Sequence, residues 1–519
     1  NITVEAGRTL TLDLNGHTIN IQSVEGYSST APLVAVDNYG TLTLRDSAGS
    51  GGIYVDTTQT SSSGRYVYAV RNNAEATATV ESGTYNSADK YAVYNAGKLT
   101  VKDGIVSSLD ADGARVSYAL YNADGGEVTI ENGSFTGTYA VYTASGSVQI
   151  SSGSFAGSLA ALNGNNSSVR ITGGGFESTG GRGFQCSGGS LTVENAEITV
   201  ASATGTVYGG IQLSSAAILS VKNSTINVSG PGKVTGIYYI GAEGETAEIV
   251  DTTIEVETAG TGYGIQVHST NKGSIALSGN TVLTVKAGTE SNVHTIDFYG
   301  NSNVTKSLTI SENVQINGGM LTLGANSVTT VTGGIFTDVT FNPRNDTATV
   351  TVTAGTFISD DVQNMGFNSS WLVSGGQSYA LYSTDTQNRY TVGVYDPDRA
   401  EDVVFVGGIV AAIVDKTYSD IAAAVEAAGD NDMITLLTSV NGLTVIAGKN
   451  ITLDLNGFNV TAAAAGEYAV TVESGALLII VGDGDVSGYN GESGYSYQNN
   501  GTLELRGGTY TQTLDFAVV

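Results

Sequence analysis

Paired carboxylates are the residues of this sequence that could cleave a glycosidic bond, since two acids can act as proton donor and as base or nucleophile. Acidic residues stand close together at several places, among them Asp110 with Asp112, Asp360 with Asp361, and Glu401 with Asp402. Such catalysis needs two acids about 5 to 9.5 Å apart across a substrate. The first pair falls in a predicted loop and the last in a predicted hinge, so we interpret these acids as solvated surface.

The three histidines do not form a metal-binding pattern. His17 lies in the string LDLNGHTI, but a second copy of this string has Phe458 at the same position, so an uncharged aromatic ring suffices there. His268 and His294 are isolated, and each is followed by a polar loop. Scattered histidines without a repeated spacing do not predict a metal site.

Asp13 and Asp454 occupy equivalent positions beside an Asn-Gly turn in the two copies of the string. We expect each carboxylate to accept hydrogen bonds from the turn backbone rather than to bind calcium. No cofactor is predicted, although incidental calcium ions at loop carboxylates and carbonyls are compatible with the acidic composition. Cys186 is the single cysteine, which excludes a disulfide or a cysteine metal site within the chain.

Tyrosines recur in pairs three residues apart, as Tyr91 with Tyr94, Tyr118 with Tyr121, and Tyr139 with Tyr142. If these segments are stacked strands, the tyrosines form two ladders, one on each side of a sheet. By comparison with Asp37, which should not be buried, the outer ladder is Tyr94, Tyr121 and Tyr142. Apolar residues at equivalent later positions favour the opposite parity. An outer ladder could stack on sugar rings, but packing between strands explains the same pattern and is favoured.

The strands that would position these residues are marked by one stretch that occurs twice. Residues 2–19 read ITVEAGRTLTLDLNGHTI, and residues 443–460 read LTVIAGKNITLDLNGFNV. Apolar and polar residues alternate with period 2, as in a half-buried strand, and Asn15-Gly16 supplies a turn. The similarity continues past this stretch, with VAVDNYGTLTL at 34–44 echoed by SYQNNGTLEL at 496–505, so we interpret the second copy as a second module that is cut short.

A shorter repeat of about twenty to thirty residues lies inside the first module. Its anchors are YAVY at 91, YALY at 118, YAVY at 139 and LAAL at 159, each followed by an alternating stretch such as KLTVKD or EVTIEN and then by a third short stretch. Three strands per repeat predict a solenoid in which each strand pairs in parallel with its counterpart one coil away. Gly, Asn and Asp suit the corners because they tolerate left-handed backbone conformations.

The pattern changes around residue 395. A charged hinge at 396–402 precedes TYSDIAAAVEAAGDND at 417–432, the one convincing helix, with Thr417 or Ser419 as N-cap and Gly429 at its end. We expect a capping helix at about 419–428, whose residues Ile421 and Val425 lie against the coil that contains Leu453 and Leu455. Such a cap would cover unpaired strand edges.

Composition and net charge argue against some classes of partner and of structure. The 519 residues carry 21 basic against 49 acidic side chains, a net charge of −28, which argues against a nucleic-acid partner. With 69 Gly and 4 Pro, the chain suits short strands and turns. No run of eighteen apolar residues occurs and no signal peptide opens the chain, so we expect no direct membrane insertion. We interpret the sequence as a fragment whose export signal and anchor lie outside this stretch.

The succession at 418–457, from YSDIAAAVEAAGD through ITLL to ITLDLNG, resembles the module opening of large bacterial surface proteins with a pectate-lyase-like right-handed β-helix. The resemblance covers both modules and implies an exported, cell-surface protein with an adhesive or structural role. Pectate lyases use clustered carboxylates for calcium with an Arg or Lys base, and the related hydrolases carry Gly-His-Gly and Arg-Ile-Lys strings. None of these strings is present, so we expect no enzymatic activity.

The sequence therefore predicts an all-β, right-handed parallel β-helix with three strands per coil. Residues 1–394 would form one module that lacks its lead-in, 395–440 a linker with the capping helix, and 441–519 the start of a second, truncated module. The expected function is a rigid extracellular rod of a tandem-repeat cell-surface or fibre-forming protein, and the alternative is a polysaccharide-binding or polysaccharide-degrading protein. Expected partners are neighbouring modules, head-to-tail copies, and host or cell-wall carbohydrate.

Overall fold

The computed structural model describes residues 1–22, 32–56, 66–108, 116–203, 205–298, 306–343, 347–384, 386–414, 416–489 and 495–511. Strands dominate these ranges, and α1 (Ile421–Ala427) is the one α-helix within them. The fold is all-β, as the sequence predicted, and most strand pairs are parallel. No helix in the described ranges has the length and hydrophobicity needed to cross a bilayer.

The chain divides into two compact units, residues 1–330 with 334–349 and residues 331–333 with 350–519. This division does not coincide with the module boundaries expected at residues 394 and 440. Those boundaries concern the sequence repeat, and they stay predictions.

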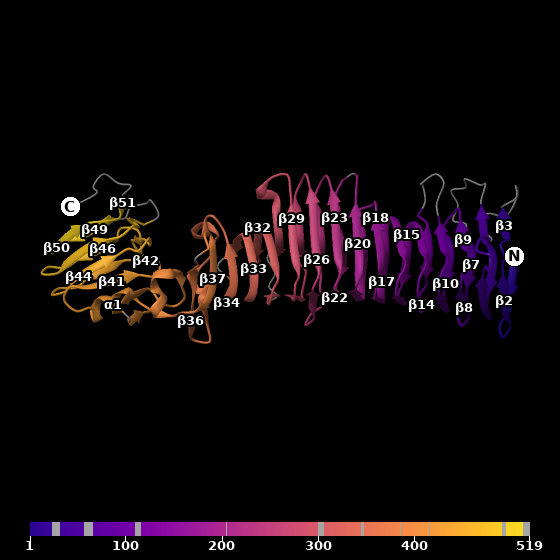
Figure 1. The fold of residues 1–519 in the computed structure, drawn as a ribbon, viewed down its shortest axis with the longest axis horizontal. Helices are drawn as coiled ribbons and strands as arrows, with labels where there is room; N and C mark the ends of the chain where they lie inside the picture. Colours follow the sequence, from indigo (N-terminus) through magenta and orange to yellow (C-terminus); the bar gives the residue numbers. More distant parts are fainter. Residues whose placement is uncertain are drawn as a thin grey trace. The chain divides into compact units, whose positions relative to one another are not determined.

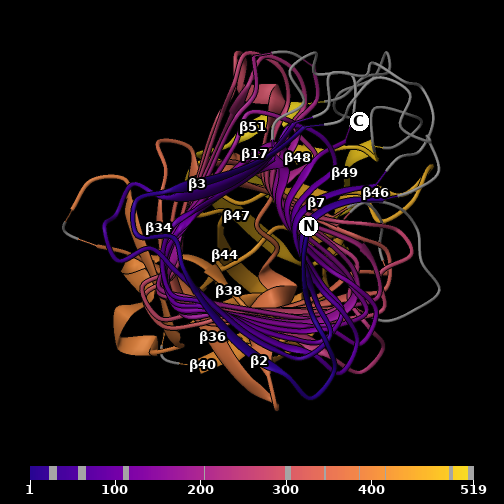
Figure 2. The same cartoon turned by 90° about the vertical axis from the view of Figure 1, so that its right-hand side faces the viewer.

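Unit 1 consists of strands that pair in parallel with their counterparts one repeat later, in three columns (Figure 1). The first column contains β1 (Ile2–Val4), β4 (Leu33–Asn38), β7 (Val67–Asn72), β10 (Tyr91–Asn95), β13 (Tyr118–Asn122), β15 (Ser134–Ala144), β17 (Ser154–Ile171), β19 (Arg182–Glu194), β21 (Gly209–Ser215), β24 (Val234–Tyr239), β27 (Gly262–Val267), β30 (Val293–Phe298) and β32 (Gln315–Leu323). In Figure 2 the backbones of successive repeats follow nearly the same outline.

The second and third columns follow the same rule. The second contains β2 (Thr9–Asp13), β5 (Thr41–Arg45), β8 (Thr77–Val80), β11 (Lys98–Val101), β14 (Glu127–Ile130), β16 (Ser147–Ile150), β22 (Ile218–Lys222), β25 (Thr246–Val250), β28 (Ser274–Ser278), β31 (Lys306–Ile310) and β33 (Ser327–Pro343). The third contains β3 (Thr18–Gln22), β6 (Gly52–Asp56), β9 (Thr84–Ser87), β12 (Ile105–Ser108), β18 (Gly174–Ser178), β20 (Ala196–Ala201), β23 (Thr225–Gly230), β26 (Thr253–Thr258) and β29 (Val282–Lys286). Long strands such as β15 and β17 run from one column into the next.

The core of unit 1 follows from the period-2 alternation along each strand. Leu99 and Val101 of β11 are buried, whereas Thr100 between them is half-buried on the opposite side. Aromatic rings fill the interior of the third column, where Phe155 stacks between Phe135 and Phe176 with centroid distances of 5.0 and 4.6 Å. Each large apolar side chain that is fully buried in this way contributes about 1.5–3 kcal/mol of transfer free energy.

A ladder of buried asparagines ends the first-column strands. Asn38, Asn72, Asn95 and Asn122 are fully buried, and each donates its side-chain N–H to the side-chain oxygen of the next, at 2.7, 2.8 and 2.7 Å. The amides also donate to backbone carbonyls at the turn, as Asn95 does to the Gly97 oxygen at 3.0 Å. Asn122 then donates to the Thr143 hydroxyl. Because the buried amides are bonded from one repeat to the next, the ladder fixes the turn in register.

Glycines mark the turns between the second and third columns. Gly104 and Gly133 have φ of 136° and 130°, and a Cβ on either would come within 2.9 Å of the carbonyl oxygen of the equivalent glycine one repeat earlier. Only glycine combines this backbone conformation with so close an approach.

Unit 2 begins with antiparallel pairing, which the sequence pattern does not indicate. Strand β37 (Arg389–Val394) pairs antiparallel with β34 (Thr349–Ile358) from Gly355 to Ile358 and with β36 (Gln377–Ser383), and β36 pairs antiparallel with β38 (Val403–Val406). Tight connections explain this change, because Asn388 and the pair Gly375-Gly376 adopt positive φ at reversals of the chain. A parallel return would need a longer connection. Parallel pairing therefore does not extend to residue 394.

Parallel columns resume after α1. One comprises β41 (Asp432–Leu436), β44 (Asn450–Asp454), β47 (Leu477–Val481) and β50 (Thr502–Leu505). The second comprises β42 (Val440–Asn441), β45 (Val460–Thr461), β48 (Asp485–Ser487) and β51 (Thr509–Thr511), and the third β43 (Leu443–Val445), β46 (Tyr468–Val472) and β49 (Tyr495–Asn499). Strand β39 (Ala411–Ile413) pairs antiparallel with β41 on one side and with β40 (Lys416–Tyr418) on the other, so the first edge of the β41 column is occupied.

Helix α1 begins two residues later than its expected span. Its N-cap is Asp420, whose carboxylate accepts from the Ala422 N–H at 3.1 Å, and not Thr417 or Ser419. Ala428, rather than Gly429, is its C-cap, and Lys449 donates to the Glu426 and Ala428 carbonyls at 2.6 Å each. The lysine therefore satisfies carbonyl groups that the helix end leaves unpaired.

The apolar face of α1 is buried in the core of unit 2. Ile421 and Val425 are 8% and 1% exposed and belong to the same core cluster as Leu453 and Leu455. The helix contacts β39, β40 and β43, which precede the β44 strand that carries Leu453. That α1 protects the end of the stacked strands from solvent and from other chains remains a prediction.

Replacing Asn95 with Ala should lower the free energy of unfolding by about 1–3 kcal/mol, because the Asn122 oxygen loses its ladder donor in a buried site. Denaturant unfolding followed by circular dichroism measures this change. Asn132→Ala is the matched control, since Asn132 is exposed and donates to the exposed Asp103 carboxylate at 3.3 Å. Equal midpoints for the two variants would show that the ladder does not stabilise the turn.

Replacing Ile421 and Val425 together with Asp should cost several kcal/mol by burying charge or undocking α1. Unit 2 should then aggregate while unit 1 keeps its parallel sheet, which limited proteolysis and light scattering would reveal. The exposed face of the same helix provides a control, Ala422→Asp with Ala423→Asp, which should remain soluble. A soluble double core variant with wild-type thermal stability would rule out a capping role for α1.

Candidate functional site

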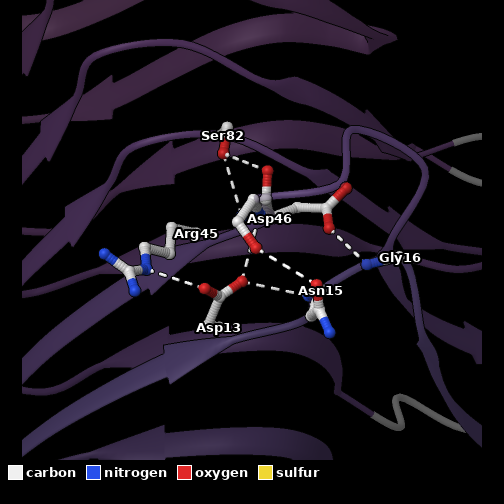
Figure 3. A network of polar contacts seen from close by, with 7 residues as sticks. Asp13, Asn15, Gly16, Arg45, Asp46 and Ser82 are labelled. Atoms are coloured by element: carbon white, nitrogen blue, oxygen red, sulfur yellow. Dashed lines mark hydrogen bonds and ion pairs between the residues drawn. The ribbon is translucent and has the colours of Figure 1, made fainter.

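The hallmark turn of unit 1, Asn15-Gly16, is held by two aspartates (Figure 3). One Asp13 oxygen accepts from the backbone N–H groups of Asn15 and Ser47 at 3.0 Å each, and the other accepts from the Arg45 side chain at 3.0 Å. Asp46 accepts from the Gly16 N–H at 2.7 Å and, with its other oxygen, from the Gly51 N–H at 2.5 Å. The carboxylates therefore satisfy turn amides, and no substrate role follows from their geometry.

The second copy of the turn repeats the hydrogen bond from the turn amide to the preceding aspartate. Asp454 accepts from the Asn456 N–H at 3.0 Å, and Asn456 has φ of 48° where Asn15 has 45°. The prediction that Asp13 and Asp454 bond to the turn backbone is confirmed. His17 is exposed, and its backbone N–H donates to the Leu14 carbonyl just as Phe458 donates to Leu455.

The acidic pairs are not brought together into one site. Asp110 and Asp112 lie outside the described residues. Asp361 caps a short 3₁₀ turn, η2 (Val362–Asn364), and Asp360 accepts from the Asn388 side chain at 2.5 Å. Asp402 pairs with Arg399 at 3.1 Å. Among the described residues, no group of three or more His, Cys, Asp or Glu side chains is arranged to hold a metal ion.

The tyrosines do form two ladders, and both ladders lie on the outer face of the first column. In the first ladder, Tyr118 stacks between Tyr91 and Tyr139 with centroid distances of 5.2 and 5.4 Å. In the second, Tyr121 stacks between Tyr94 and Tyr142 at 5.6 and 5.0 Å. Rings of the two ladders meet edge to face, as Tyr118 and Tyr121 do at 5.2 Å with an interplanar angle of 86°.

The expectation of one ladder on each side of the sheet is wrong. Tyr91 and Tyr94 are both half-buried, whereas Ala92 and Val93 between them are fully buried. Two consecutive residues therefore face the core, and simple alternation fails at this point of the strand. The outward direction expected for Tyr94 from its comparison with Asp37 holds. Asp37 itself is nevertheless buried, at 6% exposure, and its carboxylate accepts from the Arg71 Nε at 2.8 Å.

Stacking between the rings determines which parts of each tyrosine a ligand could contact. Each internal ring, such as Tyr118 or Tyr121, has both faces against neighbouring tyrosines, so sugar rings cannot stack on them. Ring edges and hydroxyl groups remain at the surface. Burial raises the pKa of Tyr118 to about 12, and burial also raises the pKa of Tyr121, so both phenols are neutral hydrogen-bonding groups at pH 7. Packing between the rings explains their sequence pattern. Carbohydrate binding at Tyr94, Tyr121 and Tyr142 stays a prediction, and at the internal Tyr121 it could use only the ring edge and the hydroxyl group.

Two histidines that are isolated in the sequence lie on this same outer face. His294 stacks on Tyr263 at 4.8 Å with an interplanar angle of 11°, and His268 lies 5.8 Å from Tyr238. Burial, with the charges of Lys306 and Lys233, lowers the pKa of His268, so its ring is uncharged at neutral pH. Since Tyr263 and His294 are paired positions in adjacent strands, the repeat alignment could have brought this pair together.

Cys186 is a core residue. It is 3% exposed, and burial raises the pKa of its thiol to about 12, so the thiolate nucleophile is absent at neutral pH. No family model and no curated protein matches this sequence.

The pKa values of Asp13 and Asp46 lie below their ordinary range, and for both the largest cause is a hydrogen bond from a backbone N–H. Carboxylates with lowered folded pKa values stabilise the fold above the unfolded pKa of about 3.9, and this stabilisation is lost as pH falls through the folded value. Asp46→Asn should therefore lower thermal stability at pH 7 and lose its deficit toward pH 3. Melting curves from pH 7 to 3 measure this; Asp56→Asn, at an exposed strand end, is the control. A deficit that is constant with pH would contradict the assignment.

Proposed function

We propose that this chain belongs to a right-handed parallel β-helix with three strands per coil, which acts as a rigid structural or adhesive rod of a bacterial cell-surface or fibre-forming protein. The observation that carries the proposal is the in-register parallel pairing of all three columns, repeat after repeat, from β1 to β33. Bending such a stack would stretch backbone hydrogen bonds on one side. A chain built in this way resists bending and proteolysis along its length.

The surface suits a rod with no catalytic centre. Its carboxylates are distributed along the chain, and those beside the hallmark turn serve the backbone, as Asp13 and Asp46 do. A net charge of −28 keeps neighbouring chains apart except where ends or specific faces meet. Neighbouring modules, head-to-tail copies and carbohydrate remain the partners that we propose, with an extracellular location at the bacterial surface.

Negative-stain images and glycan assays of the same preparation test this function. With the thirteen described strands of the first column, from β1 to β32, spaced about 4.8 Å apart, the parallel stack should appear as a straight segment on the order of 60 Å long. Incubation with acidic or neutral polysaccharides, with or without calcium, should release no reducing or unsaturated sugar ends. Flexible or globular particles would refute the rod. Release of ends that stops when acidic residues of one sheet are mutated would instead establish the polysaccharide-degrading alternative.

A further inference from the structure

The three columns of unit 1 differ in how the charges on their outer faces are neutralised. On and directly after the strands of the second column, cations pair with carboxylates of the same chain, one repeat away. These ion pairs are Arg45–Asp13 at 3.0 Å, Lys102–Glu81 at 3.0 Å, Lys98–Glu127 at 3.4 Å, Arg170–Glu194 at 3.2 Å and Lys222–Glu248 at 3.0 Å. The charges of this face are therefore balanced within the chain.

The outer face of the first column carries cations that are not balanced in this way. Arg182 on β19 and Lys233, directly before β24, lie over tyrosine rings at 4.7 and 4.8 Å, and within the described residues neither pairs with a carboxylate. Asp37 and Asp297 are the acidic side chains of the described first-column strands. They are only 6% and 2% exposed, and the first is already ion-paired. The accessible charge of this face is therefore positive.

The outer face of the third column has the opposite charge. Its described strands carry one cation, Lys286, against five exposed carboxylates, which belong to Asp56, Glu177, Glu197, Glu255 and Glu257. In the part of the chain that the structure describes, no ion pair joins any of these carboxylates to a cation. This face therefore offers carboxylates that a cation from another molecule can reach.

A hollow of about 230 Å³ lies on the third-column face. Its polar lining includes two carboxylates, one ammonium group and three neutral side chains, which belong to Glu255, Glu257, Lys286, Thr199, Asn227 and Ser229. Carboxylate, hydroxyl and amide oxygens all accept hydrogen bonds, and a lysine or arginine head group only donates them. The hollow is therefore suited to a cationic side chain.

Strand pairing fixes the spacing between the two first-column cations. Gln185 of β19 is aligned with Gln212 of β21 and then with Tyr238 of β24, one repeat apart each time. Arg182 precedes the first of these aligned residues by three positions, and Lys233 precedes the last by five. Lys233 is therefore two repeats along the stack from Arg182 and two residues closer to the start of the strand, or about 10 Å and about 7 Å.

Two third-column carboxylates have the matching spacing. Glu197 of β20 is aligned with Thr225 and then with Thr253 of β26, and Glu255 lies two residues after Thr253. Glu255 is therefore two repeats from Glu197 and two residues closer to the end of the strand. When the first column of one copy faces the third column of another with both stacks pointing the same way, the facing strands run in opposite directions. The two offsets then coincide, so each cation meets one carboxylate.

We infer that copies of this chain associate side by side, with the outer face of the first column in one copy against the outer face of the third column in the next. Arg182 and Lys233 of one copy then face Glu197 and Glu255 of the other, and this complementarity selects the partner face. Because the two surfaces differ, the contact is heterologous and can repeat into a row of rods. The inference rests on the proposed structural function and gives it a partner, a second copy of this chain.

The net charge of −28 does not prevent this contact. At physiological ionic strength the Debye length is about 8 Å, so charges in direct contact attract more strongly than the more distant acidic surfaces repel. Association should therefore depend on the two faces that meet and not on net charge alone.

Two charge-reversal variants of the full chain test the association. One replaces the first-column cations, Arg182→Glu with Lys233→Glu, and the other replaces the third-column carboxylates, Glu197→Lys with Glu255→Lys. Sedimentation velocity over a range of protein concentrations at physiological ionic strength measures association. Circular dichroism verifies that each variant is folded.

The second column provides the matched control. Lys98→Glu with Lys222→Glu makes the same change of net charge as the first-column variant, on exposed side chains of a face that takes no part in the contact. This control should associate as the wild type does.

Wild-type protein should form species larger than a dimer as its concentration rises, and each charge-reversal variant alone should sediment as a monomer because like charges meet. An equimolar mixture of the two variants should associate again, since the acidic first column of one meets the basic third column of the other. Both variants keep a strongly negative net charge, so unspecific attraction cannot produce this rescue. Rescue also shows that both variants are folded.

Wild-type protein that stays monomeric at every concentration would overturn the inference. So would association of either variant alone, absence of association in the mixture, or loss of association in the control.

Electron micrographs of the same samples separate failure of the inference from failure of the proposed function. Straight particles that stay single would overturn the side-by-side contact and leave the rod intact. Particles that are not straight would refute the rod, whether or not they associate.

Discussion

The constraint on which this structure depends is the fixed spacing between parallel strands that pair in register. A strand can form backbone hydrogen bonds with its counterpart one repeat away only if the chain turns three corners in each repeat and comes back to an equivalent position. The asparagine ladder and the positive-φ glycines are the local means of that return, because one bonds each turn to its neighbours and the other permits the closest backbone approach. The apolar core then follows from ordinary alternation along each strand.

Sequence patterning predicted the strands, the parallel pairing and the Asn-Gly turn because these depend on local rules. Period-2 alternation places Leu99 and Val101 inward, and an aspartate two residues before a turn accepts a hydrogen bond from the turn amide. The helix was also visible, since its apolar stripe needs only a 3.6-residue period. Its N-cap was misassigned because Thr417, Ser419 and Asp420 are all suitable N-cap residues, and only the folded chain places Asp420 in reach of the Ala422 N–H.

What the sequence could not supply are features decided by the neighbouring repeat. Ala92 and Val93 both face the core, so the direction of Tyr94 could not be read from alternation. The partner of His294 is likewise set by the neighbouring repeat. His294 is isolated in the sequence, yet it stacks on Tyr263 because strand pairing aligns the two residues. The antiparallel strands of unit 2 depend on tight reversals of the chain. A sequence with glycines throughout does not show at which of them the chain reverses.

The polarity of the asparagine ladder has an evolutionary consequence. Each internal ladder member, such as Asn95, is at once an acceptor from the repeat before it and a donor to the repeat after it. A repeat duplicated or deleted as a whole unit therefore leaves donors and acceptors still matched across the new junction. Within the ladder the number of repeats can change without loss of an Asn–Asn bond, whereas a change inside one repeat disturbs both of its neighbours.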